Sequence, residues 1–307
     1  MISYYSRTIN DDSLKEVSEI QKGVWIHAIE PSNAELEELA EKLSLETSIL
    51  EDAQDFFEVP RLERSGGVSY FFTRYPFNEQ KEDTDTAPLL IVIGDTFVLT
   101  ITQREVPQFQ RFYDGKIIVD TTEKTKLLIE IMQVITQSFE RHLIGLRRSV
   151  QRDRVKLRKI SNQEILRFVN YEHKLNDMVS AVLPTNVALQ QIMSGNHLSI
   201  FDDDRELFDD LRIDNAQVVE SARSLLKTIQ NIRNAAEAIL ANNLNNRIKT
   251  LTVLTILLTI PTVISLLYGM NVPLPLSYQP HAFLFVISLV VVTVSLGVWY
   301  FKKNEWL

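Results

Sequence analysis

Neutral polar side chains recur at intervals of three and four residues near the C-terminal end of the chain. The six positions are Asn245, Ile248, Thr252, Thr255, Thr259 and Thr262. All but Ile248 carry an amide or a hydroxyl group, and this spacing places them on one face of a helix. Such groups hydrogen-bond to water, to a hydrated ion or to a neighbouring helix without carrying charge. We refer to these six positions as the polar stripe.

The stripe runs through the first of two long apolar segments, residues 250–267 and 282–301. No Asp, Glu, Lys or Arg lies between Lys249 and Lys302. Roughly 20 helical residues span a hydrocarbon core of about 30 Å. Two buried helices of a soluble protein are the alternative, but two uncharged segments leave no face for water. We therefore expect transmembrane helices at 248–267 and 282–301, joined by a connector at 268–281.

Polar side chains inside a bilayer face protein or water rather than lipid, which leaves two interpretations of the stripe. It can form a helix–helix interface, with threonine hydroxyls bonding across helices or to their own carbonyls. It can also line a water-filled pore. Two spanning helices cannot enclose a pore, so this second interpretation needs a ring of identical subunits. The periodicity alone leaves both open.

The basic residues next to the apolar segments predict the orientation in the membrane. Arg247 and Lys249 precede the first segment, Lys302 and Lys303 follow the second, and the connector has neither Lys nor Arg. By the positive-inside rule, both termini and the short tail at 302–307 are cytoplasmic. The N-terminus has no apolar run after its basic residue, so no signal peptide is expected. We expect a multi-pass protein of the cell membrane.

The preceding residues predict a cytosolic α/β domain at 1–119 and a long-helix stalk region at 120–247. Alternating or β-branched segments at 24–29, 68–77, 88–94 and 96–103 indicate strands, and residues 31–43 indicate a capped helix. Helical patterns then cover 122–166, 170–193 and 203–267, the last about 100 Å long. The expected fold class is an α+β membrane protein whose stalk helix continues into the first transmembrane helix.

Several chemistries are not supported by the sequence. A net charge of −8 argues against nucleic acid as a partner, and the absence of cysteine excludes thiolate metal sites. The five histidines lack the spacing of a zinc enzyme. Gly66-Gly67 lacks the Lys-Ser/Thr continuation of a phosphate-binding loop, so ATP use is not expected. We expect neither enzymatic activity nor a bound cofactor, and an ion would have to move down its own gradient.

The tetrapeptide Tyr268-Gly269-Met270-Asn271 directly follows the first transmembrane segment. With two apolar helices and the closing FKKNEWL, it resembles the CorA family of magnesium transporters. The similarity extends to VWIHAIEPSNAELEELAEKL, SILEDAQD, VPRLE, TFVLTITQ and NNRIKTLTVLT. The resemblance implies a funnel-shaped homopentamer, which supplies the ring that the pore interpretation requires. It also implies a passive channel for Mg²⁺, with Co²⁺ and Ni²⁺ as further ions, driven by the membrane potential and gated by cytosolic Mg²⁺.

By the same resemblance, Gly269, Met270 and Asn271 form the ion-selectivity loop at the outer mouth. Asn271 would offer its amide oxygen to the water shell of Mg²⁺, an ion that loses water reluctantly. Gly269 would allow a tight turn. Without the resemblance, an asparagine at this place is explained equally by a helix C-cap. Lys302 and Lys303 would lie at the inner mouth.

The resemblance also implies regulatory carboxylates between subunits. Asp203, Asp204, Asp209 and Asp210 lie in the matching region, and Asp210 aligns nearest to the family's sensing carboxylate. The alternative is a solvated acidic helix N-terminus, which the helix dipole favours. Residues 272–276, VPLPL, lack the acidic residue that family members commonly carry there, so attraction of cations should be weaker. A proton-coupled zinc transporter of the same family and a membrane-tethered sensor or scaffold remain alternatives.

Overall fold

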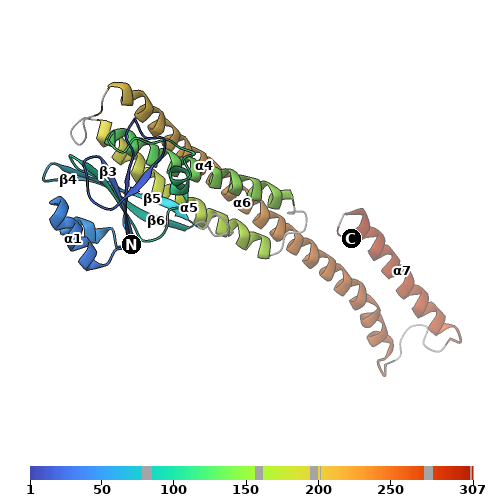
Figure 1. Ribbon diagram of the computed structural model, residues 1–307. Coiled ribbons are helices and arrows are strands. Elements are labelled where there is room, and N and C mark those ends of the chain that lie inside the picture. The colour runs from blue at the N-terminus through green and yellow to red at the C-terminus, as the bar shows by residue number, and fades with distance from the viewer. Residues whose placement is uncertain are drawn as a thin grey trace. The chain divides into compact units, whose positions relative to one another are not determined.

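The computed structural model describes residues 1–77, 85–155, 162–193, 200, 202–272, 279–304 and 306. The chain forms two compact units, Met1–Ile232 and Arg233–Leu307. The first unit contains a sheet and most of the long helices, and the second contains the apolar helices (Figure 1). Each unit is described by itself below.

The described residues of the first unit form one seven-stranded sheet with the order β2-β1-β3-β7-β6-β5-β4. The strands are β1 (Ile2–Ser6), β2 (Lys15–Val17), β3 (Val24–Ile29), β4 (Arg61–Ser65), β5 (Val68–Phe77), β6 (Asp85–Ile93) and β7 (Phe97–Thr102). Strands β3 and β7 pair in parallel, and the other neighbours pair antiparallel. The predicted hairpin at Gly94-Asp95 joins β6 to β7. A Cβ on Gly94 would lie 2.3 Å from the ring of Phe97, so this turn needs glycine.

Helices cover both faces of the sheet. They are needed on both because the apolar side chains of β3 point alternately to one face and to the other. Val24 and Ile26 pack with α1 (Asn33–Leu43) and α2 (Thr47–Asp52). Trp25 points to the other face, which is covered by the short helices η1 (Pro107–Phe109) and α3 (Gln110–Tyr113) and by α4 (Lys124–Val155) and α5 (Asn162–Met193). Both layers are therefore apolar at their sheet-facing sides, and together they form the core of the first unit.

The predicted start of α1 is confirmed, and Ser32 is its N-cap. The Ser32 hydroxyl accepts a hydrogen bond from the backbone N–H of Glu35, and the Glu35 carboxylate accepts one from the backbone N–H of Ser32. This reciprocal capping box lowers the pKa of Glu35 through those hydrogen bonds. The start of α1, the helix that follows β3, is therefore specified by residues close to it in the sequence.

The predicted boundary between the first two long helices is wrong. Helix α4 ends at Val155 and α5 begins at Asn162, so Asn162–Leu166 belongs to α5 rather than to a helix starting near residue 122. No glycine or proline between residues 150 and 170 marks the break. The available signal was Ser161-Asn162, a pair of residue types that favour helix starts, followed by Glu164 in the first turn.

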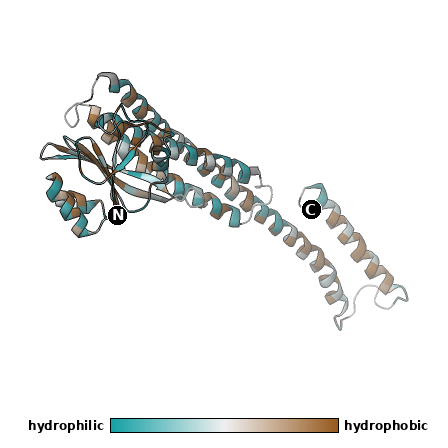
Figure 2. Cartoon of the chain, viewed as in Figure 1, coloured by the Kyte–Doolittle hydropathy of each residue, from teal (hydrophilic) through white to brown (hydrophobic). Residues whose placement is uncertain are grey.

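Helix α6 (Asp202–Tyr268) has 67 residues, which confirms the prediction of one long helix continuing into the first apolar segment. Helix α7 (Ala282–Lys303) is the second apolar segment. Both are long and apolar enough to cross a membrane, and none of the apolar part of α7 is buried. Figure 2 shows the change from mixed to mostly hydrophobic residues toward the C-terminal part of the chain.

Candidate functional site

The signature residues follow immediately after α6, which ends at Tyr268. The backbone N–H of Gly269 donates to the carbonyls of Ser265 at 2.9 Å and Leu266 at 3.2 Å, and the N–H of Met270 donates to Leu267 at 3.3 Å. These bonds close the last helical turn and leave Met270 and Asn271 exposed. The side chains of the loop are thus free to contact a ligand from outside the chain.

Gly269 lies in a turn directly after α6, and its φ angle is not positive. A Cβ at this position would lie 3.3 Å from the carbonyl oxygen of Ser265. Glycine therefore permits a close approach of the backbone to the last turn of α6. A larger residue would push the loop away from the helix end.

All six positions of the polar stripe are exposed in the single chain. The four threonine hydroxyls donate to the carbonyl four residues earlier, at distances of 2.8–2.9 Å. The acceptors are Ile248, Leu251, Thr255 and Leu258. A hydroxyl has one proton and two lone pairs, so each threonine is left with acceptor capacity alone. The four threonines of the stripe therefore present a column of neutral hydrogen-bond acceptors.

The stripe points away from the second apolar helix. The less exposed side of α6 carries Val253, Leu257, Ile260 and Ile264. Leu257 faces α7, because its Cδ2 lies 3.0 Å from where a Cβ on Gly297 would be. At 3.6 residues per turn, this side and the threonines are roughly 150° apart around the helix. The chain's own α7 is therefore not the helix that the stripe packs against.

The basic and aromatic residues at the end of α7 form a compact group. Lys302 and Lys303 occupy its last turn, and the Lys303 ammonium lies 5.2 Å from the ring centroid of Trp299. Phe301 contacts both Tyr300 and Trp306 through its ring. Cations and amphipathic rings at one helix end are typical of a membrane–water interface.

The acidic positions lie on the first turns of α6, which begins at Asp202. Asp204 and Asp209 are half-buried and Asp210 is exposed, while the side chain of Asp203 lies outside the described residues. Asp209 accepts a hydrogen bond from Arg212 at 3.2 Å. Among the described residues, no three His, Asp or Glu side chains come together to hold a metal ion. The described carboxylates of one chain therefore do not complete a metal site here.

Two features of the membrane segment were not anticipated from the sequence. Gly297 lies where α7 meets Leu257 of α6. The sequence indicated this contact only by a single glycine within an apolar helix. A groove of about 370 Å³ lies along α6. Its lining residues are Ile256, Thr259, Ile260, Val263 and Ile264. The signal for this groove was the run of β-branched residues beside the stripe.

The fold and the site together define a two-helix integral membrane protein with a soluble α/β unit and a Gly-Met-Asn loop after its first apolar helix. Comparison with known proteins identifies the family. Residues 21–303 match the model of the CorA-like Mg²⁺ transporter proteins, and the chain belongs to this family.

The similarity covers nearly the whole chain. The cobalt/magnesium transport protein CorA of Methanocaldococcus jannaschii is 26% identical over 98% of this chain and 96% of its own length. The complete structure of the CorA magnesium transporter from that organism has a TM-score of 0.88 and 23% identity, covering 100% of this chain and 99% of that one. The cytoplasmic domain of ZntB from Vibrio parahaemolyticus shares the fold over 78% of this chain and 98% of its own, with a TM-score of 0.65 and 9% identity.

Proposed function

We propose that this protein is a passive channel for divalent cations, Mg²⁺ first among them and Co²⁺ or Ni²⁺ as further ions. Family membership supports the transport class, and the name of the relative from Methanocaldococcus jannaschii supports Mg²⁺ and Co²⁺. In this proposal several copies, five by the family resemblance, surround a pore in the cell membrane. Both termini lie in the cytoplasm, and the ion enters past Gly269, Met270 and Asn271.

The observation that carries the proposal is that the four threonine hydroxyls of the polar stripe are left with acceptor capacity alone. Water molecules around a cation hold their oxygens inward and direct their hydrogens outward. A lining of hydroxyl oxygens, whose own protons are bound to helix carbonyls, accepts hydrogen bonds from that water shell. The lining is neutral, so the ion is not trapped by a strong charge. Mg²⁺ suits such a path because it keeps its waters.

The membrane potential supplies the driving force in this proposal. Moving one charge through 100 mV releases about 2.3 kcal/mol, so a divalent ion gains about 4.6 kcal/mol. This corresponds to more than a thousandfold accumulation. Neither ATP nor a second ion is required for uptake.

We further propose that cytosolic Mg²⁺ closes the pore by binding carboxylates at the start of α6. Asp203, Asp204, Asp209 and Asp210 are the candidates. Since a single chain does not bring three such groups together among its described residues, the site would need a carboxylate from a second copy. Mg²⁺ would then hold adjacent copies in one arrangement, and loss of the ion would release them.

Ion uptake into proteoliposomes tests the channel directly, with the unmodified protein beside Asn271→Ala. Alanine removes the amide oxygen from the entrance, so we expect Mg²⁺ uptake, read with an enclosed magnesium-sensitive dye, to fall at least about tenfold. That loss corresponds to about 1.4 kcal/mol of barrier. Cross-linking of the detergent-solubilised protein serves as the control that the oligomer is intact.

Two outcomes would contradict the proposal for magnesium. Uptake of Zn²⁺ but not Mg²⁺ by the unmodified protein, with dependence on a pH gradient, would assign it to proton-coupled zinc transport. No uptake of either ion would leave a membrane-tethered sensor or scaffold, whose apolar helices only anchor and oligomerise the soluble unit.

A further inference from the structure

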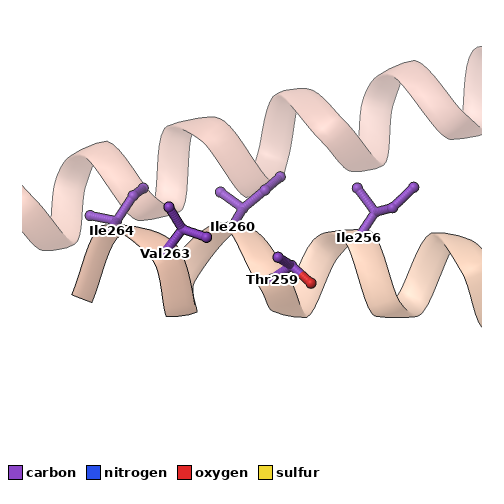
Figure 3. A pocket seen from close by; sticks show the side chains of 5 residues that line it. All are labelled: Ile256, Thr259, Ile260, Val263 and Ile264. Atoms are coloured by element: carbon purple, nitrogen blue, oxygen red, sulfur yellow. The ribbon is translucent and has the colours of Figure 1, made fainter. Parts of the chain in front are cut away.

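Helix α7 meets α6 through one of its sides. Figure 3 shows the aliphatic residues that line the groove of α6 pointing toward this second helix. On α7 the facing residue is Gly297, where an added Cβ would lie 3.0 Å from Leu257 of α6. The less exposed residues of α7 lie within about 60° of Gly297 around the helix, and they are Ala282, Val286, Val290, Thr293, Val294 and Phe301. The described residues of the chain therefore leave the other side of α7 uncovered.

The uncovered side of α7 carries side chains whose chemistry changes in order along the helix. At spacings of four, three and four residues, it carries Val292, Leu296, Trp299 and Lys303. These four residues lie within about 60° of one another and about 100–160° away from Gly297. The first three are 51%, 59% and 61% exposed, and Lys303 is exposed as well. This face, which we call the outer face of α7, therefore passes from aliphatic to aromatic to cationic.

The order of groups on the outer face matches the depth profile of one bilayer leaflet. From Val292 to Lys303 the helix rises about 16 Å, close to half of a hydrocarbon core of about 30 Å. Tryptophan rings favour the boundary between acyl chains and headgroups, and a lysine ammonium reaches outward to the headgroups. The outer face therefore presents a track for an acyl chain that ends at a cation.

The charge of the second unit favours an anion at this cation. Residues 233–307 contain five basic and two acidic residues, although the whole chain has a net charge of −8. The acidic residues are Glu237 and Glu305, and Glu305 lies outside the described residues. The Lys303 ammonium lies 5.2 Å from the ring centroid of Trp299, within the range of a cation–π interaction. The ring thus holds the ammonium at the end of the apolar track.

A phospholipid satisfies the whole outer face, whereas other occupants satisfy only part of it. A free phosphate would bind the ammonium and leave the aliphatic and aromatic side chains uncovered. A second copy that docked through the same face would bring two Lys303 ammonium groups together, which their repulsion opposes. An anionic phospholipid covers the apolar residues with its acyl chain and brings its own negative charge to the lysine.

From these observations we propose that the outer face of α7 binds one anionic phospholipid. An acyl chain lies along Val292 and Leu296, and the headgroup phosphate accepts a hydrogen bond from the Lys303 ammonium beside Trp299. The leaflet is the one at the C-terminal end of α7, which the positive-inside rule makes the cytoplasmic leaflet. Anionic lipids give that leaflet its negative surface potential. This inference concerns lipid recognition and goes beyond the proposed channel.

Quenching of tryptophan fluorescence by brominated lipid tests this site. In a Trp306→Phe background, Trp299 is the only tryptophan of the second unit, and Trp25 is buried in the first unit. The full chain is reconstituted in brominated phosphatidylcholine with increasing fractions of unbrominated phosphatidylglycerol or phosphatidylcholine. Recovery of fluorescence then reports displacement of brominated lipid from Trp299. The test variant is Lys303→Gln, and the matched control is Lys302→Gln, the same charge change about 100° around the helix.

We expect phosphatidylglycerol to displace the brominated lipid about fivefold more effectively than phosphatidylcholine, which is the effect of one basic residue near an anionic surface. Lys303→Gln should abolish this preference, because it removes the charge and keeps a side chain of similar length. Lys302→Gln should keep most of the preference, since its side chain lies beside the outer face and not on it.

Three outcomes would overturn the proposal. Equal displacement by the two lipids in the Trp306→Phe background would mean that the face does not select an anionic lipid. An equal loss in both lysine variants would indicate diffuse attraction by the basic end of α7 instead of a site. A lack of quenching by brominated lipid would mean that a protein surface, such as a second copy, covers the face. No readout requires ion flux, so the result is independent of the proposed channel.

Discussion

The threonines of α6 use their protons within their own helix and present oxygen lone pairs outward. Serine reproduces this back-bonding, whereas valine keeps the shape of threonine and removes the oxygen. The distinction matters only if water or a hydrated ion lies against the stripe. At a lipid-facing or protein-packed surface, valine would be tolerated or even favourable.

We predict that Thr259→Val lowers Mg²⁺ flux at least about tenfold, and that Thr259→Ser stays within a few-fold of the unmodified protein. A hydrogen bond contributes about 0.5–1.5 kcal/mol, and the substitution removes one acceptor from every copy in the ring. Tenfold is about 1.4 kcal/mol. Stopped-flow dye uptake measures the difference. Equal flux from the two variants would place the stripe outside the pore.

His27 is a residue of the soluble unit whose charge state depends on the fold. His27 is 3% exposed, its Nδ1 lies 2.8 Å from the Thr100 hydroxyl, and the ring of Phe109 packs edge-on against its ring. Burial lowers its pKa to about 4, and a hydrogen bond to Thr100 opposes that shift. The folded protein therefore holds His27 neutral where an unfolded chain would bind a proton.

This difference predicts a pH dependence of folding. The unfolded state binds more protons between the unfolded pKa of about 6.5 and the folded value of about 4, so stability is full above pH 6.5 and falls as pH drops toward 4. The slope contributed by one such group approaches about 1.4 kcal/mol per pH unit. Thermal melts of the unmodified protein and His27→Gln, from pH 7 to 4.5, should show a shallower slope in the variant. Parallel slopes would mean that His27 does not titrate in this range.

At the scale of elements, α6 contributes to both units and its apolar part has chemically distinct sides. One side contacts α7, the opposite side carries the acceptors, and the two borders carry leucines and β-branched residues. Pro261 lies within this part and removes one helix hydrogen bond, which transmembrane helices tolerate. The helix is thus both a spanning element and the element that positions the candidate pore lining.

Gly297 tests the contact between α6 and α7. A Cβ here would lie 3.0 Å from Leu257 Cδ2, the movable end of a side chain, so Gly297→Ala should change stability little. Gly297→Leu overpacks the contact and should destabilise by about 1–3 kcal/mol. Thermal stability of the detergent-solubilised oligomer measures both variants. If leucine is tolerated as well as alanine, the two helices do not pack closely at this point.

At the scale of the whole molecule, transport should follow the electrical potential. Liposomes with an imposed potassium diffusion potential, negative inside, should take up Mg²⁺ faster and to a higher level than liposomes at zero potential. At 100 mV the limit of accumulation is about 4.6 kcal/mol, more than a thousandfold. A pH gradient at zero potential should have no such effect. If the pH gradient drives uptake and the potential does not, transport is coupled to protons.

The local features of this chain could be read from its sequence. The alternation along β3, the capping box at Ser32, the turn at Gly94 and the apolar lengths of α6 and α7 each depend on neighbours close in sequence. The break between α4 and α5 was predicted too far along the chain, at 167–169, because no glycine or proline marks its position. Residues within one helical turn or one hairpin largely decide such elements, apart from their exact ends.

The two apolar helices, the α/β unit, the polar stripe and the Gly-Met-Asn motif follow from the sequence alone, because periodicity and composition specify them. The tertiary structure was needed to show which side of α6 meets α7, that the threonine protons are bound within the helix, and that a groove lies beside the stripe. Periodicity shows that residues share a face, whereas the partner of that face depends on packing between segments distant in sequence.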